Sequence, residues 1–168
     1  MNFQETTIDD TSGILDLYKR VAVTPGGLAR LLDEIDENYV SNFITKTINN
    51  GVGLVAIDEN SQIVGEIHAY KTGLYCFSHV LSELTIAVDP NFQGKGIGRE
   101  LLSHLLSKVK DSYPEITRVE LIARESNQKA IILYKSLGFV PEGRLLGRIR
   151  NLDNTFESDI PMAWIRTY

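Results

Sequence analysis

Apolar residues recur with a helical period over two segments in the first third of the chain. Residues 2–8 alternate loosely and predict a short strand, after which Asp9 and Asp10 offer N-caps for a helix over roughly 10–22. The TPGG stretch at 24–27 breaks that helix. A second helix is predicted from Ile35 to Asn49, with Gly51 ending it. The apolar stripes of the two helices are Ile14, Leu15, Leu17, Tyr18 and Val21, and Tyr39, Val40, Phe43, Ile44 and Ile48.

The period changes from helical to extended after Gly51. The runs 52–58 and 62–71, separated by a short polar turn, predict an antiparallel hairpin, and a third extended run covers 79–89. The remaining elements alternate, with a helix at 96–111, a strand at 117–124, a helix at 127–137, and strands near 139–149 and 155–166. This order predicts an α/β (α+β) fold, in which a mixed, mostly antiparallel sheet of about seven strands is flanked by about four helices.

Composition narrows the class of protein. A chain of 168 residues is expected to form a single domain over 1–168. The net charge of −5 argues against nucleic acid or an anionic membrane as a partner held by bulk charge. No apolar run approaches the roughly 18 residues of a membrane span, and the N-terminus lacks a signal-peptide pattern, so a cytoplasmic protein is expected. The single Cys76 and three separated histidines offer no metal-ligand spacing, so no metal is expected.

The most informative segment is the glycine-rich turn within residues 88–106. Asp89-Pro90-Asn91 stops a strand, the glycines at 94, 96 and 98 alternate, and an amphipathic helix starts at once. Such a turn exposes unpaired backbone N–H groups at the positive end of a helix dipole, and glycines let a ligand approach the main chain. The segment therefore predicts an anion site, with phosphate as the common anion.

Two familiar phosphate motifs do not match this turn. A dinucleotide-binding fingerprint needs G-x-G-x-x-G, whereas this turn has G-x-G-x-G. A P-loop needs Gly-Lys-Ser/Thr at its end, whereas Gly98 is followed by Arg99 and Glu100. The structural alternative is a turn that only packs a helix against the sheet.

The run V-D-P-x-x-Q-G-K-G-I-G-R-x-L-L resembles the pyrophosphate-binding motif of the GNAT acyltransferase superfamily, Arg/Gln-x-x-Gly-x-Gly/Ala. The order of elements is also similar over essentially the whole chain, so the expected fold is GNAT-like. The resemblance implies an acetyl-CoA-dependent N-acetyltransferase, with acetyl-CoA as co-substrate bound through its pyrophosphate. The implied donors of the turn are Gln93, Gly94, Lys95, Gly96, Ile97, Gly98 and Arg99.

A second segment, residues 124–139, resembles the other signature of that family, an Asn that opens a helix and a Tyr seven residues later. Asn127 and Tyr134 hold these places, and Gly138 closes the helix. Seven residues are nearly two turns, roughly 10 Å along one helix face, which suits two points on a pantetheine arm. The alternatives are a core tyrosine and an N-cap asparagine. Basic residues that suit the phosphates lie near the two helix starts, at Lys95, Arg99, Lys129 and Lys135.

Amide formation from a thioester needs a proton for the departing thiolate, a donor to the thioester oxygen and a base for the amine. Tyr134 is a sensible general acid, because phenols and thiols have similar pKa values. The resemblance implies a main-chain N–H near Ala87 and Val88 as the donor to the oxygen. It also implies Glu83 as base or water-holding residue; alternation puts Glu83 on the face of Leu81, Thr85 and Ala87, where we expect a semi-buried carboxylate with raised pKa. His68 and His79 compete for that role, and a water chain could replace a dedicated base.

The acceptor site is implied to lie around residues 24–39 and 148–159. The acidic residues Asp33, Glu34, Asp36 and Glu37 would attract an ammonium or polyamine, whereas Arg30, Arg148 and Arg150 would suit a carboxylate. Phe156-x-x-Asp159-x-x-Met162 resembles the branch of amino-acid N-acetyltransferases, so a small-molecule amine is the first expectation. Protein N-termini, including those of ribosomal proteins, are the alternative acceptor, and a non-catalytic CoA-binding sensor is the alternative class. A homodimer is expected only by analogy.

Overall fold

The computed structural model describes residues 1–24 and 26–167, and the predicted elements are found in the predicted order. The helices of this part of the chain are α1 (Thr11–Ala22), α2 (Glu37–Asn50), α3 (Ile97–Ser112) and α4 (Gln128–Ser136). Its strands are β1 (Asn2–Glu5), β2 (Gly51–Ile57), β3 (Ile63–Tyr70), β4 (Val80–Val88), β5 (Arg118–Arg124), β6 (Val140–Pro141), β7 (Leu145–Arg150) and β8 (Phe156–Ile165). The predicted break at 24–27 includes Pro25, which lies outside the described residues.

Local hydrogen bonds explain where the first elements begin and end. The Thr7 N–H donates to the Asp10 carboxylate at 2.7 Å, which starts a 3-10 turn and ends β1 earlier than predicted. Helix α2 begins at Glu37, because the Asp36 carboxylate caps the Tyr39 N–H at 2.7 Å. Gly51 ends α2, as the sequence predicts.

Two details of the predicted elements are wrong. Ile48 is exposed, and Thr47 takes the buried place on α2 with its hydroxyl donating to the Phe43 carbonyl at 2.7 Å. The strand predicted over 139–149 is divided into β6 and β7. The segment pairs with β8 at Val140 and Pro141, the Glu142 N–H donates to the Pro161 carbonyl at 2.9 Å, and the pairing then stops and resumes at Leu145.

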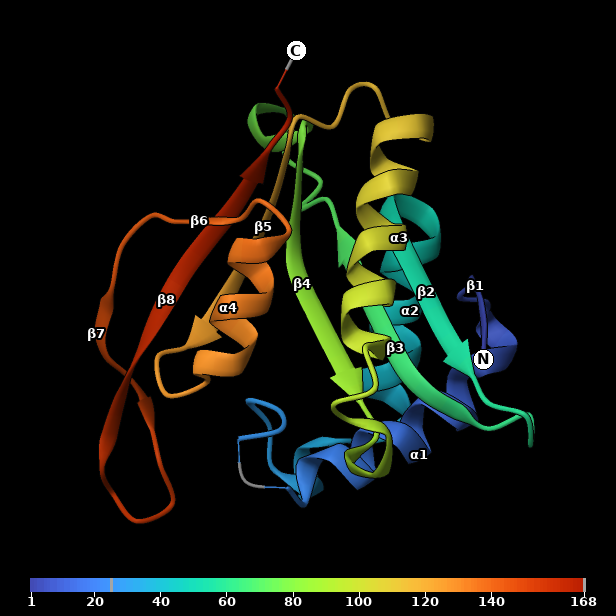
Figure 1. Cartoon of the computed structure of the whole chain (residues 1–168), viewed down its shortest axis with the longest axis vertical. Coiled ribbons are helices and arrows are strands. Elements are labelled where there is room, and N and C mark those ends of the chain that lie inside the picture. Colours follow the sequence, from blue (N-terminus) through green and yellow to red (C-terminus); the bar gives the residue numbers. More distant parts are fainter. Residues whose placement is uncertain (25, 168) are drawn as a thin grey trace.

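The sheet is mixed, and the parallel pair of strands among the described residues, β4 and β5, determines where the site lies. The strand order is β1-β2-β3-β4-β5-β8-β6, with β7 also paired to β8. The other described pairs are antiparallel, whereas β4 and β5 run parallel and pair only at Val80 with Arg118 and Leu81 with Val119. Figure 1 shows the two strands side by side at one end and diverging toward the other. The sheet therefore opens between the carboxyl ends of β4 and β5.

Two clusters of buried apolar residues hold the helices on opposite faces of the sheet. Helices α1 and α2 pack through residues such as Leu17 and Phe43 on one face. Helices α3 and α4 pack through residues such as Leu105 and Ile131 on the other (Figure 1). Among the described residues, no helix combines the length and the apolar character that a membrane crossing requires.

Replacement of Leu105 by alanine should destabilise the protein. The Leu105 side chain is fully buried in the cluster under α3. Its truncation removes transfer free energy and leaves a cavity, so the free energy of unfolding should fall by about 2–5 kcal/mol in denaturant titration. Ile132→Ala, at an exposed position of α4, is the matched control and should change the free energy of unfolding by less than about 1 kcal/mol.

Candidate functional site

The opening between β4 and β5 is lined at its end by the glycine-rich turn. After β4, Asp89 caps a short 3-10 turn over Pro90–Phe92, and α3 then starts behind Gly96. Gly94 and Gly96 have φ values of +76° and +84°, which residues with a side chain rarely adopt. A Cβ at either glycine would meet no described atom within 4 Å, so the surface of the turn is open to a ligand.

The backbone amides of the turn are free. None of the N–H groups from Gln93 to Arg99 donates a hydrogen bond to another residue of the described part of the chain. The first turn of α3 adds the positive end of its dipole. Seven consecutive free amides at an open glycine turn suit an anionic group such as the pyrophosphate that the family resemblance implies.

A buried ion pair anchors the start of this turn. Asp89 is buried, its Oδ2 lies 2.6 Å from Arg20 Nε of α1, and its Oδ1 accepts from the Asn91 N–H at 2.9 Å. Arg20 also donates to the Ile63 carbonyl at 2.9 Å. The carboxylate thus joins α1, β3 and the turn. Its role as an anchor was not recognised from the sequence, although a carboxylate before Pro90 was visible there.

The two residues expected near the thioester oxygen, Ala87 and Val88, direct their backbone N–H groups to opposite sides of β4. The Asp89 N–H donates to Val64 of β3 at 2.9 Å, so alternation directs the Ala87 N–H toward β3 and the N–H groups of Ile86 and Val88 toward the opening. The Val88 carbonyl also faces that side, since it accepts from Gln93 Nε2 at 3.3 Å. Val88 therefore offers a free donor within the opening.

Tyr134 lies in α4 beside the opening, where it is buried. Burial raises the pKa of Tyr134 to about 12, so the phenol is protonated at neutral pH. Its hydroxyl makes no hydrogen bond with any described residue. Asn127 precedes α4 and its Oδ1 accepts from the Ala130 N–H at 3.1 Å. The asparagine is therefore an N-cap, and its side-chain NH2 is left for other contacts.

A direct hydrogen bond joins α3 and α4, the two helices that carry the signature segments. Arg99 of α3 donates through Nη2 to the Ser136 hydroxyl of α4 at 2.8 Å. Lys95 Nζ lies 4.5 Å from the centre of the Phe92 ring. Lys129 and Lys135 are exposed on α4. The basic residues named from the sequence thus lie on the turn and on the two helices that border the opening.

Glu83 lies elsewhere on the sheet than the strand alternation predicts. A bulge in β4 sets Ser82 opposite Tyr70 and Thr85 opposite His68, so that two residues, Glu83 and Leu84, oppose one. Glu83 has φ +56° at this bulge and is exposed. The expected semi-buried carboxylate is therefore wrong, and the bulge puts Leu81 on the face opposite to Thr85 and Ala87.

Glu83 nevertheless lies on the side of the aromatic residues of α2 and β3. Burial raises the pKa of both Tyr39 and Tyr70, and the Glu83 charge contributes further in the same direction. The Arg30 guanidinium lies 3.9 Å from the centre of the Tyr39 ring. These residues form a polar and aromatic surface on the α1/α2 face of the opening. His79, by contrast, lies before β4 at its closed end, where β4 and β5 are paired.

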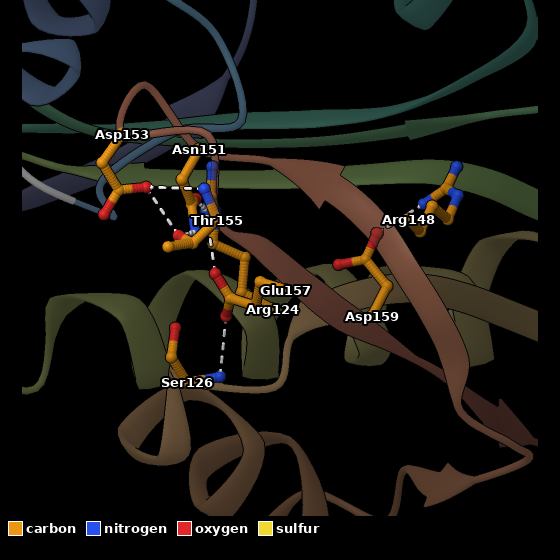
Figure 2. A network of polar contacts seen from close by, with 8 residues as sticks. All are labelled: Arg124, Ser126, Arg148, Asn151, Asp153, Thr155, Glu157 and Asp159. Carbon is orange, nitrogen blue, oxygen red and sulfur yellow. Dashed lines mark hydrogen bonds and ion pairs between the residues drawn. The ribbon is translucent and has the colours of Figure 1, made fainter.

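A polar network holds the β7–β8 hairpin against the end of β5. Arg124 Nη1 lies 3.1 Å from Glu157 Oε2, and Glu157 Oε1 accepts from the Ser126 N–H at 2.9 Å (Figure 2). Arg148 Nη1 lies 2.6 Å from Asp159 Oδ2 in the same hairpin. Arg124 Nε is enclosed without a partner among the described residues. The network gives the β5 side of the opening a fixed border.

Several charged side chains expected to bind the acceptor instead form hydrogen bonds or ion pairs with residues of their own segment. Asp36 caps α2, and Glu34 accepts from the Leu31 N–H at 2.8 Å. Arg148 pairs with Asp159, and Arg150 donates to Asn154 at 2.7 Å. Arg30 is exposed and stacked on Tyr39 of α2. Of the residues in the last strand, Phe156 is exposed and Met162 lies in the core.

The comparison with known families agrees with this arrangement. The sequence model of the Acetyltransferase (GNAT) family matches residues 17–139, most of the chain. The chain belongs to the acetyltransferase (GNAT) family. The match includes both signature segments and the opening between β4 and β5 of this GNAT protein.

Relatives of this GNAT protein differ in the acceptor that their names state. The "[Ribosomal protein bS18]-alanine N-acetyltransferase" of Salmonella typhimurium is 48% identical over 63 residues, which span 36% of this chain and 41% of that protein. The "L-amino acid N-acyltransferase MnaT" of Escherichia coli is 26% identical over 132 residues, which span 78% of this chain and 74% of that protein. The solved structure of yncA from Salmonella typhimurium, described with its cofactor acetyl-CoA, superposes with a TM-score of 0.85 at 19% identity, covering 100% of this chain and 95% of that one.

Proposed function

We propose that this protein transfers an acetyl group from acetyl-CoA to a primary amine. The observation that carries the proposal is the run of free amides from Gln93 to Arg99 at the opening between β4 and β5. The turn would hold the pyrophosphate, and the side-chain amide of Asn127 would bind the pantetheine arm. The bound coenzyme supplies an acetyl thioester, which an amine attacks at its carbonyl carbon.

The catalytic groups of the chain have separate tasks in this proposal. The Val88 N–H donates to the thioester oxygen as negative charge develops there. Tyr134 donates its hydroxyl proton to the departing sulfur. Glu83, exposed on the bulge, attracts the ammonium form of the acceptor and holds water beside it. The overall reaction releases one proton, because the ammonium loses two N–H protons and the thiol gains one.

For the acceptor we propose a small-molecule amine of the amino-acid class. The similarity to MnaT covers 132 residues and therefore extends well beyond the coenzyme-binding segments at 88–139 into the elements around the acceptor. Arg30, exposed and stacked on Tyr39 of α2, is a suitable partner for a carboxylate. A protein N-terminus is the second candidate, because the ribosomal-protein enzyme is 48% identical over its shorter match.

One assay tests the reaction and separates these acceptors. The protein is incubated with acetyl-CoA and, separately, with each L-amino acid, with spermidine, and with a peptide that begins with the N-terminus of a ribosomal protein. Release of free thiol is then measured. We expect the highest kcat/KM among the L-amino acids. Thiol release with the peptide alone would assign the second candidate, and coenzyme binding without thiol release for any acceptor would indicate a non-catalytic sensor.

Three further expectations belong to the proposal. We propose that residues 1–168 act as one catalytic domain, which the full-length superposition on yncA supports. A cytoplasmic location and a homodimer stay predictions, the second of which sedimentation of the purified protein would test.

A further inference from the structure

A buried polar network lies behind the opening, on the α1/α2 face of the sheet. The Tyr18 hydroxyl of α1 donates to Glu66 Oε2 of β3 at 2.6 Å. His68 Nδ1 lies 3.0 Å from Glu66 Oε1 and 3.2 Å from Oε2. Glu66 and Tyr18 are 0% exposed and His68 is 3% exposed. A fully buried carboxylate costs free energy unless its hydrogen bonds are satisfied, so this arrangement needs a reason beyond packing.

The geometry determines which nitrogen of His68 is free. Tyr18 donates to Glu66, and an ionised carboxylate can only accept, so a neutral His68 ring beside ionised Glu66 presents Nδ1–H to it. Nε2 is then unprotonated in the neutral ring. Nε2 makes no hydrogen bond with a described residue. The fully enclosed side-chain atoms that lack a partner among the described residues are Thr6 Oγ1 and Arg124 Nε. Nε2 is not among them, so part of its surface is accessible.

Two aromatic rings hold the imidazole in its plane. Phe43 stacks on one side, with ring centres 4.2 Å apart and an interplanar angle of 16°. Tyr70 stacks at 5.9 Å and 7°. Tyr18 also stacks on Phe43 at 5.4 Å. The ring is therefore positioned by packing as well as by the Glu66 hydrogen bond, which is the preorganisation that a general base requires.

The register places this network one strand away from the opening, on the α1/α2 face of the sheet. Glu66 is paired directly with Ala87, and His68 with Thr85, so their side chains share the face of Thr85 and Ala87. Thr85 and Ala87 are about 7 Å apart along β4. Val88, whose N–H faces the opening, follows Ala87. The other histidine considered, His79, precedes β4 at the closed end of the sheet and cannot reach this region.

We propose that His68 is the general base for the acceptor amine and that Glu66 and Tyr18 are its positioning residues. The inference rests on the proposed acetyl transfer and adds the path of one proton to it. The N–H bond of the ammonium breaks, its electron pair stays on nitrogen, and the proton goes to Nε2 directly or through one water. The imidazolium then forms an ion pair with Glu66, so proton uptake neutralises a buried negative charge. The proton leaves to solvent through the same nitrogen.

Other titratable or charged groups around the imidazole also contribute to the pH dependence of the reaction rate. They are Tyr18 on α1, Tyr39 and Lys46 on α2, Glu66 and Tyr70 on β3, Glu83 on β4, and Arg30 in the loop before α2. Burial, followed by the Glu66 charge and hydrogen bond, raises the pKa of Tyr18 well above its usual value, so Tyr18 stays a donor to Glu66. Burial also raises the pKa of Tyr39 and Tyr70, so neither competes as a base near neutral pH.

The test compares His68→Gln, Glu66→Gln and the matched control His79→Gln in the full chain, with the best L-amino acid from the thiol-release assay. We expect His68→Gln to lower kcat on the order of a hundredfold near neutral pH, with unchanged coenzyme A affinity in calorimetry. The deficit should shrink as the pH approaches the pKa of the amine itself, because an unprotonated amine needs no base. Glu66→Gln should lower kcat about tenfold, and His79→Gln should behave as the wild type.

A deficit of equal size at every pH would mean a structural role only, and a kcat within twofold of the wild type would exclude His68 as the base. Either result overturns the inference while the acetyl transfer by the wild type stands. If the wild type binds coenzyme A but acetylates no amine, the proposed function itself fails. A measurement without turnover adds a second criterion: ¹⁵N NMR of the wild type should place the proton of the neutral His68 ring on Nδ1, and a neutral ring with its proton on Nε2 would overturn the assignment even if His68→Gln does not fold.

Discussion

Replacement of Gly96 by valine is expected to abolish binding of coenzyme A. Gly96 has φ +84° and stands at the N-cap of α3, in the middle of the free amides of the turn. A branched side chain there would cover the N–H groups that a diphosphate must reach. Because nothing lies within 4 Å of a Cβ at this position in the free protein, the loss of binding would come from blocked access and backbone strain and not from a clash in the core.

Gly73→Val is the matched control for the strain. Gly73 has φ +86°, lies in the loop between β3 and β4, and also has nothing within 4 Å of its Cβ position. Both variants should lose about 1–3 kcal/mol in free energy of unfolding, which is the cost of the backbone conformation. Calorimetric titration with coenzyme A should show normal affinity for Gly73→Val and none for Gly96→Val. Normal affinity of Gly96→Val would refute the assignment of the turn to the pyrophosphate.

Tyr134→Phe should lower the maximal rate on the order of 10²–10⁴-fold, since the departing thiolate would have no positioned proton donor. The substitution removes only the hydroxyl, which bonds to no described residue, so packing around the ring should persist. Coenzyme A affinity and the free energy of unfolding should therefore be nearly unchanged. The measurement is thiol release at saturating acetyl-CoA and amine, combined with calorimetric titration of coenzyme A.

Tyr113→Phe is the matched control, because it also removes a tyrosine hydroxyl but at a position away from the site. Tyr113 lies at the C-terminal cap of α3, at the opposite end of that helix from the glycine turn. We expect its maximal rate to equal that of the wild type. A Tyr134→Phe enzyme with the wild-type rate would exclude the phenol as the acid, and reduced coenzyme affinity with an unchanged rate would assign Tyr134 to binding alone.

The glycine turn and α4, which carry the proposed coenzyme contacts, were predictable as local structure because their determinants are local. A strand that stops at Pro90, glycines at 94 and 96, and a helix that starts at Ile97 together require free amides at a helix N-terminus, whatever surrounds them. The spacing of Asn127 and Tyr134 in α4 is equally a property of one helix. The order of strands and helices followed from the change of hydrophobic period, and the errors in these elements lay at their ends, at Ile48 of α2 and in the split between β6 and β7.

The acceptor side could not be predicted in this way. Alternation along β4 assigns Glu83 to a half-buried face, but one extra residue at the bulge reverses the alternation before Thr85 and leaves Glu83 exposed. No pattern in the sequence predicts that bulge. The arginines expected to bind a carboxylate at 148 and 150 are engaged within their own hairpin, which depends on how β7 and β8 pair.

The sequence by itself therefore determined the fold class, the glycine turn with its free amides and the place of the tyrosine in α4, because each depends mainly on residues within about two turns or one strand of one another. Only the tertiary structure decided where β4 and β5 separate, which amide of β4 faces the gap, and that Tyr18, Glu66 and His68 meet. The physical reason is distance along the chain: Tyr18 and Glu66 are 48 residues apart, and their hydrogen bond forms only after α1 has packed on the sheet.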